Sequence, residues 1–387
     1  MHAHKSGRSW RMWLILLTAF GALIAGAASV VAADEQVKPE EPVRRFLYVA
    51  VPGVRDYLEH GGHGLLVFDI DNDYKFVKRI RTAGLSPEKK PLNVKGICGS
   101  VTTGRIYIST IKQLMCLEIE ADTIRWERTY RAGCDRMSIT SDGQMIFLPS
   151  LEGPTWYVLN GADGRVLREI VRNSGAHNTV VGLSGKFAYL AGLRSPFLSV
   201  ASTTHDSTAD ESVRNVGPFA ASIRPFTVNG TETRCYVNVN ELLGFEVGDL
   251  TTGKKLHRVE VEGFEKGPVK RHGCPSHGVG LTPDEREVWV TDAHNRRMHV
   301  FDNTVEPPKQ AASIELRDEP GWITFSLDGR HAWPSTGDVV DTQTREIVAR
   351  LTDEQGRAVQ SEKMIEVHLQ GKKAVRLGDQ FGIGRVE

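Results

Sequence analysis

Short runs of alternating apolar and polar residues recur along most of the chain, and residues 276–302 show this pattern most clearly. An apolar approach leads there to a turn at residues 282–285, which contains threonine, proline, aspartate and glutamate. The apolar runs 288–290 and 298–301 follow, with a polar loop between them. Because successive side chains of a strand point to opposite faces, this period of two predicts short antiparallel strands joined by tight turns.

The same arrangement returns at intervals of roughly 40 residues, which is typical of the blades of a β-propeller. Turn residues stand at matching places in four units: residues 141–143, 183–185, 282–284 and 327–329. The first unit lacks an inner strand, and the spare apolar run 364–369 can supply it beside residues 46–51. We therefore predict an all-β protein, a single seven-bladed β-propeller over residues 43–387 that is closed by pairing of N- and C-terminal strands.

Composition supports a turn-rich β protein and removes one class of partner. The 387 residues include 38 glycines and 17 prolines, and the 48 basic residues (lysine and arginine) equal the 48 acidic ones. A formal net charge of zero gives no reason to expect nucleic acid as a partner. The 5 cysteines form no Cys-x-x-Cys motif, which favours buried apolar strand residues over haem, zinc or redox sites.

The beginning of the chain has the pattern of a targeting segment. Lysine and arginine residues precede an apolar run over residues 13–28, and small residues end at Ala33. This pattern predicts a signal peptide at 1–33, a linker at 34–42 and a periplasmic or secreted protein. An uncleaved membrane anchor is the alternative. After removal of the signal peptide no contact with a membrane is expected, because no other long apolar run follows.

One strand of the sixth unit carries a family resemblance. Residues 288–292 read VWVTD, begin five residues after the Pro283-Asp284 turn and lead to the run 300–302. This resembles the repeat of the YVTN-family β-propellers, in which a Tyr-Val-Thr-Asn strand follows a Ser-Pro-Asp-Gly turn. The resemblance implies a propeller over residues 43–370 and an extracytoplasmic setting. It implies no single activity, because lactonase-like enzymes and quinoprotein dehydrogenase-like chains carry such repeats.

The loops that enter the inner strands of a propeller open on one face, at the mouth of the central channel. Counting back eight residues from the turn glycine, or from Glu285 where the glycine is absent, gives equivalent positions in the units. These positions are Gly96, Asp135, His177, Phe219, His277 and Gly321. Two histidines and an aspartate therefore recur at the predicted channel mouth.

Neighbouring loops add further polar side chains to the same face. The loops after the second strands contribute His63 and His294, with Asp292 beside His294. Arg136 and Arg194 are predicted to point toward this rim as well. Of the 13 histidines, these map to the rim: His60, His63, His177, His272, His277 and His294.

Two kinds of site are compatible with this rim. Neutral imidazoles suit a transition metal such as zinc, copper, nickel or iron, with these predicted ligands: His63, His177, His277 and His294. Asp292 is then the expected hydrogen-bond acceptor for the second ring nitrogen of His294. A site without metal would bind a small ligand through these residues: Asp135, Arg136, Arg194 and Asp292. A wet polar channel lining is the alternative to both.

The predicted function is that of an exported propeller which binds a small molecule or a metal ion at the channel mouth without turnover. A lactonase-like hydrolase or lyase that acts at the same rim is the alternative. A subunit of a quinoprotein-type dehydrogenase comes third, because nothing in the chain supplies a redox cofactor by itself. A protein partner stays open in all three cases.

Overall fold

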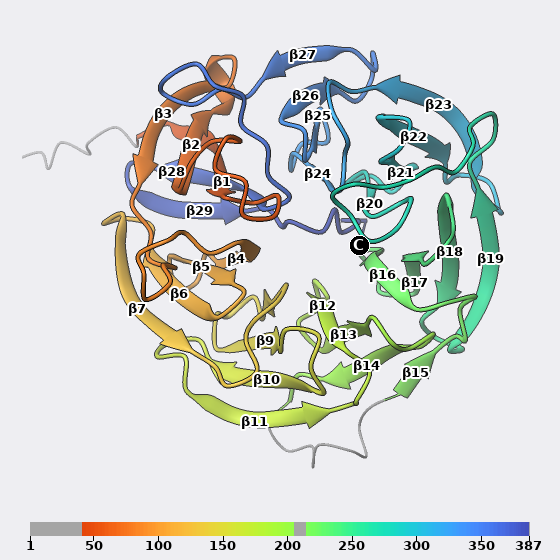
Figure 1. The fold of residues 1–387 in the computed structure, drawn as a ribbon, viewed down its shortest axis with the longest axis horizontal. Helices are drawn as coiled ribbons and strands as arrows, with labels where there is room; N and C mark the ends of the chain where they lie inside the picture. Colours follow the sequence, from red (N-terminus) through yellow and green to blue (C-terminus); the bar gives the residue numbers. More distant parts are fainter. Residues whose placement is uncertain (1–40, 205–213, 387) are drawn as a thin grey trace, which may run out of the picture. The chain divides into compact units, whose positions relative to one another are not determined.

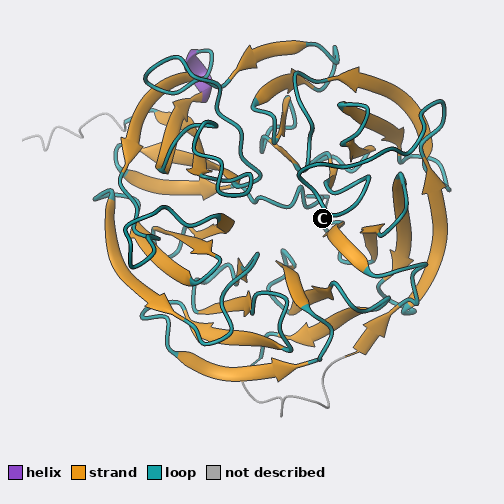
Figure 2. Ribbon diagram, viewed as in Figure 1, coloured by secondary structure: helices purple, strands orange, loops and turns teal. Residues whose placement is uncertain are grey.

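The computed structural model describes residues 41–204 and 214–386. The predicted signal peptide at 1–33 and most of the predicted linker at 34–42 lie outside these residues. Within the described part of the chain, no helix is both long and apolar enough to cross a membrane. Strands dominate the same part, which also contains the short 3-10 helix η1 (Ile70–Asn72) (Figure 2).

The described residues form seven antiparallel sheets around a central axis (Figure 1), so the prediction of a seven-bladed propeller is confirmed. The first sheet contains β1 (Val43–Val51), β2 (Gly64–Asp69), β3 (Lys75–Ile80), β28 (Met364–Gln370) and β29 (Lys373–Leu377). The second contains β4 (Val94–Ser100), β5 (Arg105–Thr110), β6 (Gln113–Glu118) and β7 (Thr123–Thr129). The third contains β8 (Ser138–Ile139), β9 (Met145–Pro149), β10 (Thr155–Asn160) and β11 (Val166–Val171).

The other four sheets continue around the ring in sequence order. The fourth contains β12 (Ala176–Val181), β13 (Phe187–Gly192), β14 (Leu198–Ser202) and β15 (Arg214–Val216). The fifth contains β16 (Ile223–Val228), β17 (Arg234–Val239), β18 (Gly244–Asp249) and β19 (Lys254–Glu260). The sixth contains β20 (Val279–Leu281), β21 (Glu287–Asp292), β22 (Arg297–Asp302) and β23 (Lys309–Glu315). The seventh contains β24 (Ile323–Phe325), β25 (His331–Pro334), β26 (Asp338–Asp341) and β27 (Ile347–Arg350).

Strands from the two ends of the chain close the ring, as predicted. β28 pairs antiparallel with β1, and this register places Phe46 opposite Val367 and Tyr48 opposite Ile365. The pairing covers a backbone edge of β1 that would otherwise be open to pairing with other chains. β29 extends the same sheet beyond β28, which the sequence pattern does not predict.

Neighbouring blades pack through their middle strands, which are buried on both faces. In β21 every residue after Glu287 is buried, whereas the outer strand β11 buries Ile170 alone. Trp289 of β21 packs edge-on against Phe325 of the seventh blade, with ring centroids 5.5 Å apart. The cysteines are free and buried, in agreement with their interpretation as apolar strand residues.

The inner strand of the fifth blade differs from its prediction. The apolar pattern places this strand at residues 219–223, but β16 begins only at Ile223. Phe219 belongs to a connection from the fourth blade, and its N–H donates to the carbonyl oxygen of Pro196 at 2.8 Å. Its side chain is buried in a cluster with residues of the fourth blade. A buried connection has the same apolar signature as a strand, which explains the difference.

The C-terminal segment 378–386 lies within the central channel, and the chain end is near the axis in Figure 1. Its carbonyl oxygens accept hydrogen bonds from the inner strands of the fifth, sixth and seventh blades, at Thr227, Leu281 and Thr324. Near its end, the N–H of Arg385 donates to the carbonyl oxygen of Pro283, which follows the inner strand β20. The segment therefore closes part of the channel at the exit ends of the inner strands.

Candidate functional site

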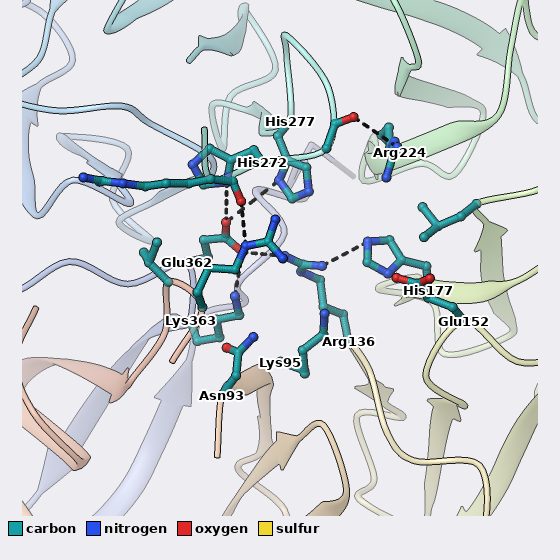
Figure 3. Close-up of a pocket in the computed structure, with 15 residues that line it drawn as sticks. Asn93, Lys95, Arg136, Glu152, His177, Arg224, His272, His277, Glu362 and Lys363 are labelled. Atoms are coloured by element: carbon teal, nitrogen blue, oxygen red, sulfur yellow. Dashed lines mark hydrogen bonds and ion pairs between the residues drawn. The ribbon is translucent and has the colours of Figure 1, made fainter. Parts of the chain in front are cut away.

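A cavity of about 210 Å³ lies where residues at the entry to the inner strands come together, and we call it the mouth cavity (Figure 3). Because each blade begins its inner strand at the same end of the channel, the cavity collects side chains from distant parts of the sequence. Its ionisable lining consists of Arg55, Lys95, Arg136, Arg224, Arg271, Lys363, Glu152, Glu362, His177, His272 and His277. Basic groups thus outnumber carboxylates in its wall.

Glu362 is the centre of the contacts in the mouth cavity. It lies two residues before the first residue of the closing strand β28, and its Oε2 accepts from Nη2 of Arg136 and, at 2.6 Å, from Nζ of Lys363. Burial by itself would raise the pKa of this carboxyl, but the charges of Lys363 and Arg136 outweigh burial and hold the pKa well below its usual value. Glu362 is therefore a fixed negative charge inside a basic cavity.

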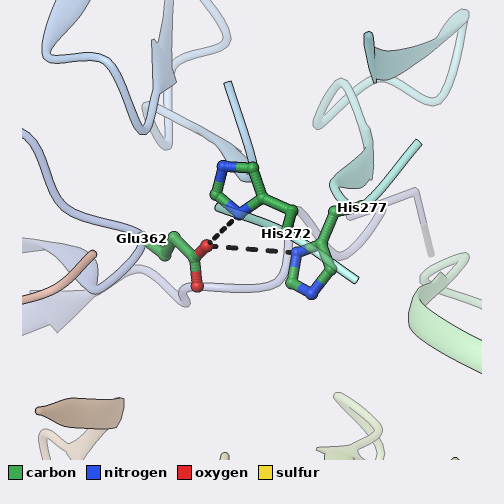
Figure 4. A group of neighbouring side chains, drawn as sticks. All are labelled: His272, His277 and Glu362. Atoms are coloured by element: carbon green, nitrogen blue, oxygen red, sulfur yellow. Dashed lines mark ion pairs between the residues drawn. The ribbon is translucent and has the colours of Figure 1, made fainter. Parts of the chain in front are cut away.

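His272 and His277 face the other oxygen of the same carboxylate (Figure 4). Oε1 of Glu362 lies 3.0 Å from Nδ1 of His272 and 4.0 Å from Nδ1 of His277. Nδ1 of His277 also donates to the carbonyl oxygen of Gly321 at 2.9 Å. Burial lowers the pKa of His277 well below its ordinary value, so the ring is neutral near pH 7. Nε2 of His272 is buried and has no hydrogen-bond partner within residues 41–204 and 214–386.

Arg136 connects Glu362 to His177 across the mouth cavity. Nη1 of Arg136 lies 3.1 Å from Nε2 of His177, whose Nδ1 lies 2.7 Å from Oδ2 of Asp135. Since a guanidinium only donates, Nε2 of His177 is the acceptor and Nδ1 carries the proton. Burial lowers the pKa of His177, which keeps this tautomer neutral. The guanidinium also lies 4.7 Å from the ring centroid of Trp322, within the range of a cation–π contact.

Lys363 makes the charge of the mouth cavity sensitive to pH. Its Nζ donates to the carbonyl oxygen of Gly53 at 2.9 Å as well as to Glu362. Burial lowers its pKa to about 7, although the neighbouring carboxylate of Glu362 opposes that shift. Both the neutral and the charged amine are therefore populated near neutral pH.

The structure brings four of the predicted site residues together: Asp135, Arg136, His177 and His277. His63 and His294 lie elsewhere. Nε2 of His63 lies 3.2 Å from the carbonyl oxygen of Ala83, and His294 is exposed in the turn between β21 and β22. The loops that carry them follow the second strands, and neither residue lines the mouth cavity.

Asp292 and Arg194 also make contacts that differ from the prediction. Oδ2 of Asp292 lies 3.1 Å from Nε2 of His299 and accepts from Asn295, so it is not the partner of His294. Arg194 is exposed, and its Nη2 donates to the carbonyl oxygen of Glu152 at 3.0 Å. Asp292 thus supports its own hairpin, because it lies at the end of β21 rather than at the entry to an inner strand.

Lys95, Glu362 and Lys363 line the mouth cavity but are not among the equivalent positions of the repeat, and His272 maps to the rim without a role. The sequence nevertheless contains a positional signal for Lys95, Glu362 and Lys363. Glu362 and Lys363 directly precede the apolar run 364–369, so they enter an inner strand as Asp135 and Arg136 do. Lys95 directly precedes Gly96, which is one of the equivalent positions.

Comparisons with known proteins support the fold. No protein-family model matches the chain, so membership of the YVTN family stays a prediction, and no curated protein matches it either. Among solved structures, the chain is similar to the dihydro-heme d1 dehydrogenase NirN in complex with DHE. That similarity has a TM-score of 0.59 at 14% sequence identity and covers 86% of this chain and 72% of that chain. At this identity the likeness shows a shared propeller fold and nothing more.

Proposed function

We propose that the protein binds a small anionic ligand, of the carboxylate class, in the mouth cavity and does not convert it to a product. The observation that carries this proposal is a pair of arginines in the cavity wall. Arg55 and Arg224 line the cavity, and neither forms an ion pair with any carboxylate among the described residues. Both donate to neutral oxygens instead, Arg55 to the carbonyl of Arg271 and Arg224 to Asn240 and Gly273.

The balance of charge supports the same proposal. Two carboxylates outside the lining neutralise part of the basic wall, since Asp135 pairs with Lys95 at 3.3 Å and Asp318 pairs with Arg271 at 2.8 Å. Even when Asp135 and Asp318 are counted with the carboxylates of the lining, basic side chains outnumber carboxylates. An anion that enters a partly buried basic site forms charge-assisted hydrogen bonds, which are stronger than neutral ones. Guanidinium groups match the planar geometry of a carboxylate particularly well.

A ligand-binding role is also compatible with the structural neighbour. The NirN structure is a complex with DHE, so a propeller of this fold can hold a small ligand. A hydrolase mechanism has less support in this chain. Either His177 or His277 would have to act as the general base, and Nε2 of His177 accepts from Arg136 and is therefore occupied, which leaves only His277 for this role.

Calorimetric titration with succinate, citrate and neutral succinamide tests this proposal. Both carboxylates should bind saturably and more weakly at higher salt, because the attraction is partly screened, whereas succinamide should not bind. Arg224→Gln should weaken carboxylate binding by about 1.5–3 kcal/mol, as expected for loss of a hydrogen bond to a charged group.

Arg172→Gln provides a matched control for Arg224→Gln. Arg172 also donates to an asparagine, Asn215, at 3.1 Å, but it does not line the mouth cavity. This variant should bind carboxylates as the wild type does. Equal affinity of succinate and succinamide, or equal weakening by both substitutions, would reject the anion site.

A transition metal held by His272, His277 and Glu362 is a second candidate. One ligand atom from each of these residues lies within 4.8 Å of the others. The separation of 3.0 Å from Oε1 of Glu362 to Nδ1 of His272 does not exceed twice a zinc bond, roughly 4 Å. Nδ1 of His277 lies 4.0 Å from the same oxygen, but it would have to release the proton that it donates to Gly321 before it could bind a metal. Two histidines and a carboxylate are a known zinc donor set, which also suits related metals. Arg136 and Lys363 oppose this candidate, because they already neutralise Glu362.

Elemental analysis of the purified protein distinguishes the two candidates. The metal candidate predicts one equivalent of metal in the wild type, and loss of that metal in the double variant His272→Gln/His277→Gln. The variant His63→Gln should keep the metal, because His63 lies outside the group. Metal-free protein that still binds citrate would leave the anion site as the function of the cavity.

A further inference from the structure

A second cavity, of about 320 Å³, lies at the exit ends of the inner strands, and we call it the tail cavity. Its wall comes from β4, β8 and β12 on one side, at residues such as Ile97, Ile139 and Val181. The C-terminal segment forms the other side, through Gln380 and Phe381. No residue of the mouth cavity lines it.

The path of the C-terminal segment explains why this space exists. The segment accepts hydrogen bonds from the inner strands of the fifth to seventh blades, at Thr227, Leu281 and Thr324. It therefore occupies that part of the channel and leaves space beside the second to fourth blades. The tail cavity lies in this space, between the inner strands and the segment that closes the channel.

The tail cavity has a mainly apolar wall, which also contains Ser100, Thr102, Ser138 and Ser141, and one buried donor without a partner among the described residues. Gln380 is completely buried, and its Oε1 accepts from the N–H of Ile97 at 2.6 Å. Its Nε2 is buried and has no hydrogen-bond partner among the described residues. A buried donor without an acceptor is unfavourable, so an acceptor atom beside Nε2 would stabilise the folded protein.

Charge around the tail cavity points to a neutral ligand. Its charged lining residues, Asp379 and Arg385, pair with each other at 2.6 Å. Asp379 also accepts from the N–H groups of Phe381 and Ile383, which fixes the carboxylate within the C-terminal segment. No charge in the wall is therefore left for an ionic ligand.

We propose that the tail cavity is a second binding site, for a small neutral apolar molecule that presents a carbonyl oxygen to Nε2 of Gln380. Apolar walls supply the affinity through burial, and the single donor orients the ligand. The proposal does not depend on the anion site, because the two cavities share no lining residue and prefer ligands of different charge.

Acetophenone and ethylbenzene are matched probes, since they have similar shapes and differ in the carbonyl oxygen. Titration of the full mature chain, monitored by ligand-observed NMR, should show saturable binding of both probes. Acetophenone should bind about three- to tenfold more tightly, which is the contribution of one hydrogen bond. In Gln380→Met this preference should disappear while the binding of ethylbenzene is retained.

Val181→Phe gives an independent test that keeps Gln380. The larger ring fills the tail cavity, so both probes should lose binding, while the titration with citrate at the mouth cavity is unchanged. Val171→Phe, at an exposed position of β11, is the control and should bind both probes. Absence of saturable binding to the wild type, unchanged binding in Val181→Phe, or equal affinity of the two probes would overturn the proposal.

Discussion

Nη2 of Arg136 donates to Oε2 of Glu362, although the two residues are 226 positions apart in the sequence. Arg136 precedes the inner strand of the third blade, and Glu362 precedes the strand that closes the ring. The contact therefore links the middle of the chain to its end across the channel. Both side chains are almost fully buried, with 4% and 6% of their surface exposed. A buried pair of this kind is sensitive to the loss of one partner.

Glu362→Gln should destabilise the protein strongly. It leaves Arg136 and Lys363 without their shared carboxylate, and removal of one partner from a buried ion pair costs about 3–5 kcal/mol. Urea unfolding at about pH 6, where Lys363 is mainly charged, measures this change. Glu354→Gln is the control, because Glu354 pairs with Arg79 at the surface and its side chain is 33% exposed. That variant should lose no more than about 1 kcal/mol.

Removal of the closing strand should have a different effect from removal of the channel segment. A chain that ends at Lys363 lacks β28 and β29, so β1 loses its partner and the ring opens. This variant should aggregate or show no cooperative unfolding. A chain that ends at Leu377 keeps the closed ring and should retain a cooperative transition at a lower Tm. A cooperative transition in the shorter chain would contradict the role of β28.

The contribution of Asp135 should depend on pH. Burial would raise its pKa, but His177, Lys95 and Arg136 outweigh burial and lower the pKa below its ordinary value. The unfolded state then binds the proton more readily, so stability from Asp135 is present above about pH 4 and is lost as the pH falls below that value. The Tm difference between wild type and Asp135→Asn should be largest at about pH 6 and should shrink toward pH 3. A constant difference would exclude this linkage.

Export is a separate prediction, based on residues outside the described part of the chain. The pattern of residues 1–33 predicts cleavage near Ala33, so the mature protein should begin near Asp34. N-terminal sequencing of protein from the periplasm or the medium checks this position. Protein that keeps residues 1–33 in a membrane fraction would support the anchor alternative.

The number of blades and the way the ring closes follow from local patterns. Alternation of period two reports which residues form strands, and the spare run 364–369 beside an incomplete first unit indicates closure. The position of Arg136 and His177 at the channel mouth follows from the same repeat, because equivalent places in each blade enter the channel at the same end. These features depend on neighbouring residues in the sequence, and so they can be predicted from it.

Other parts of the site depend on contacts between distant segments, which no local pattern contains. The sequence determines that His277 enters an inner strand, but only the tertiary structure places it beside His272 and Glu362. The C-terminal segment is a similar case: its residues show no regular period, and their hydrogen bonds to three different blades decide that they lie in the channel. Strand periodicity is a property of adjacent residues, whereas the site arises where a closed ring brings separate strand ends together.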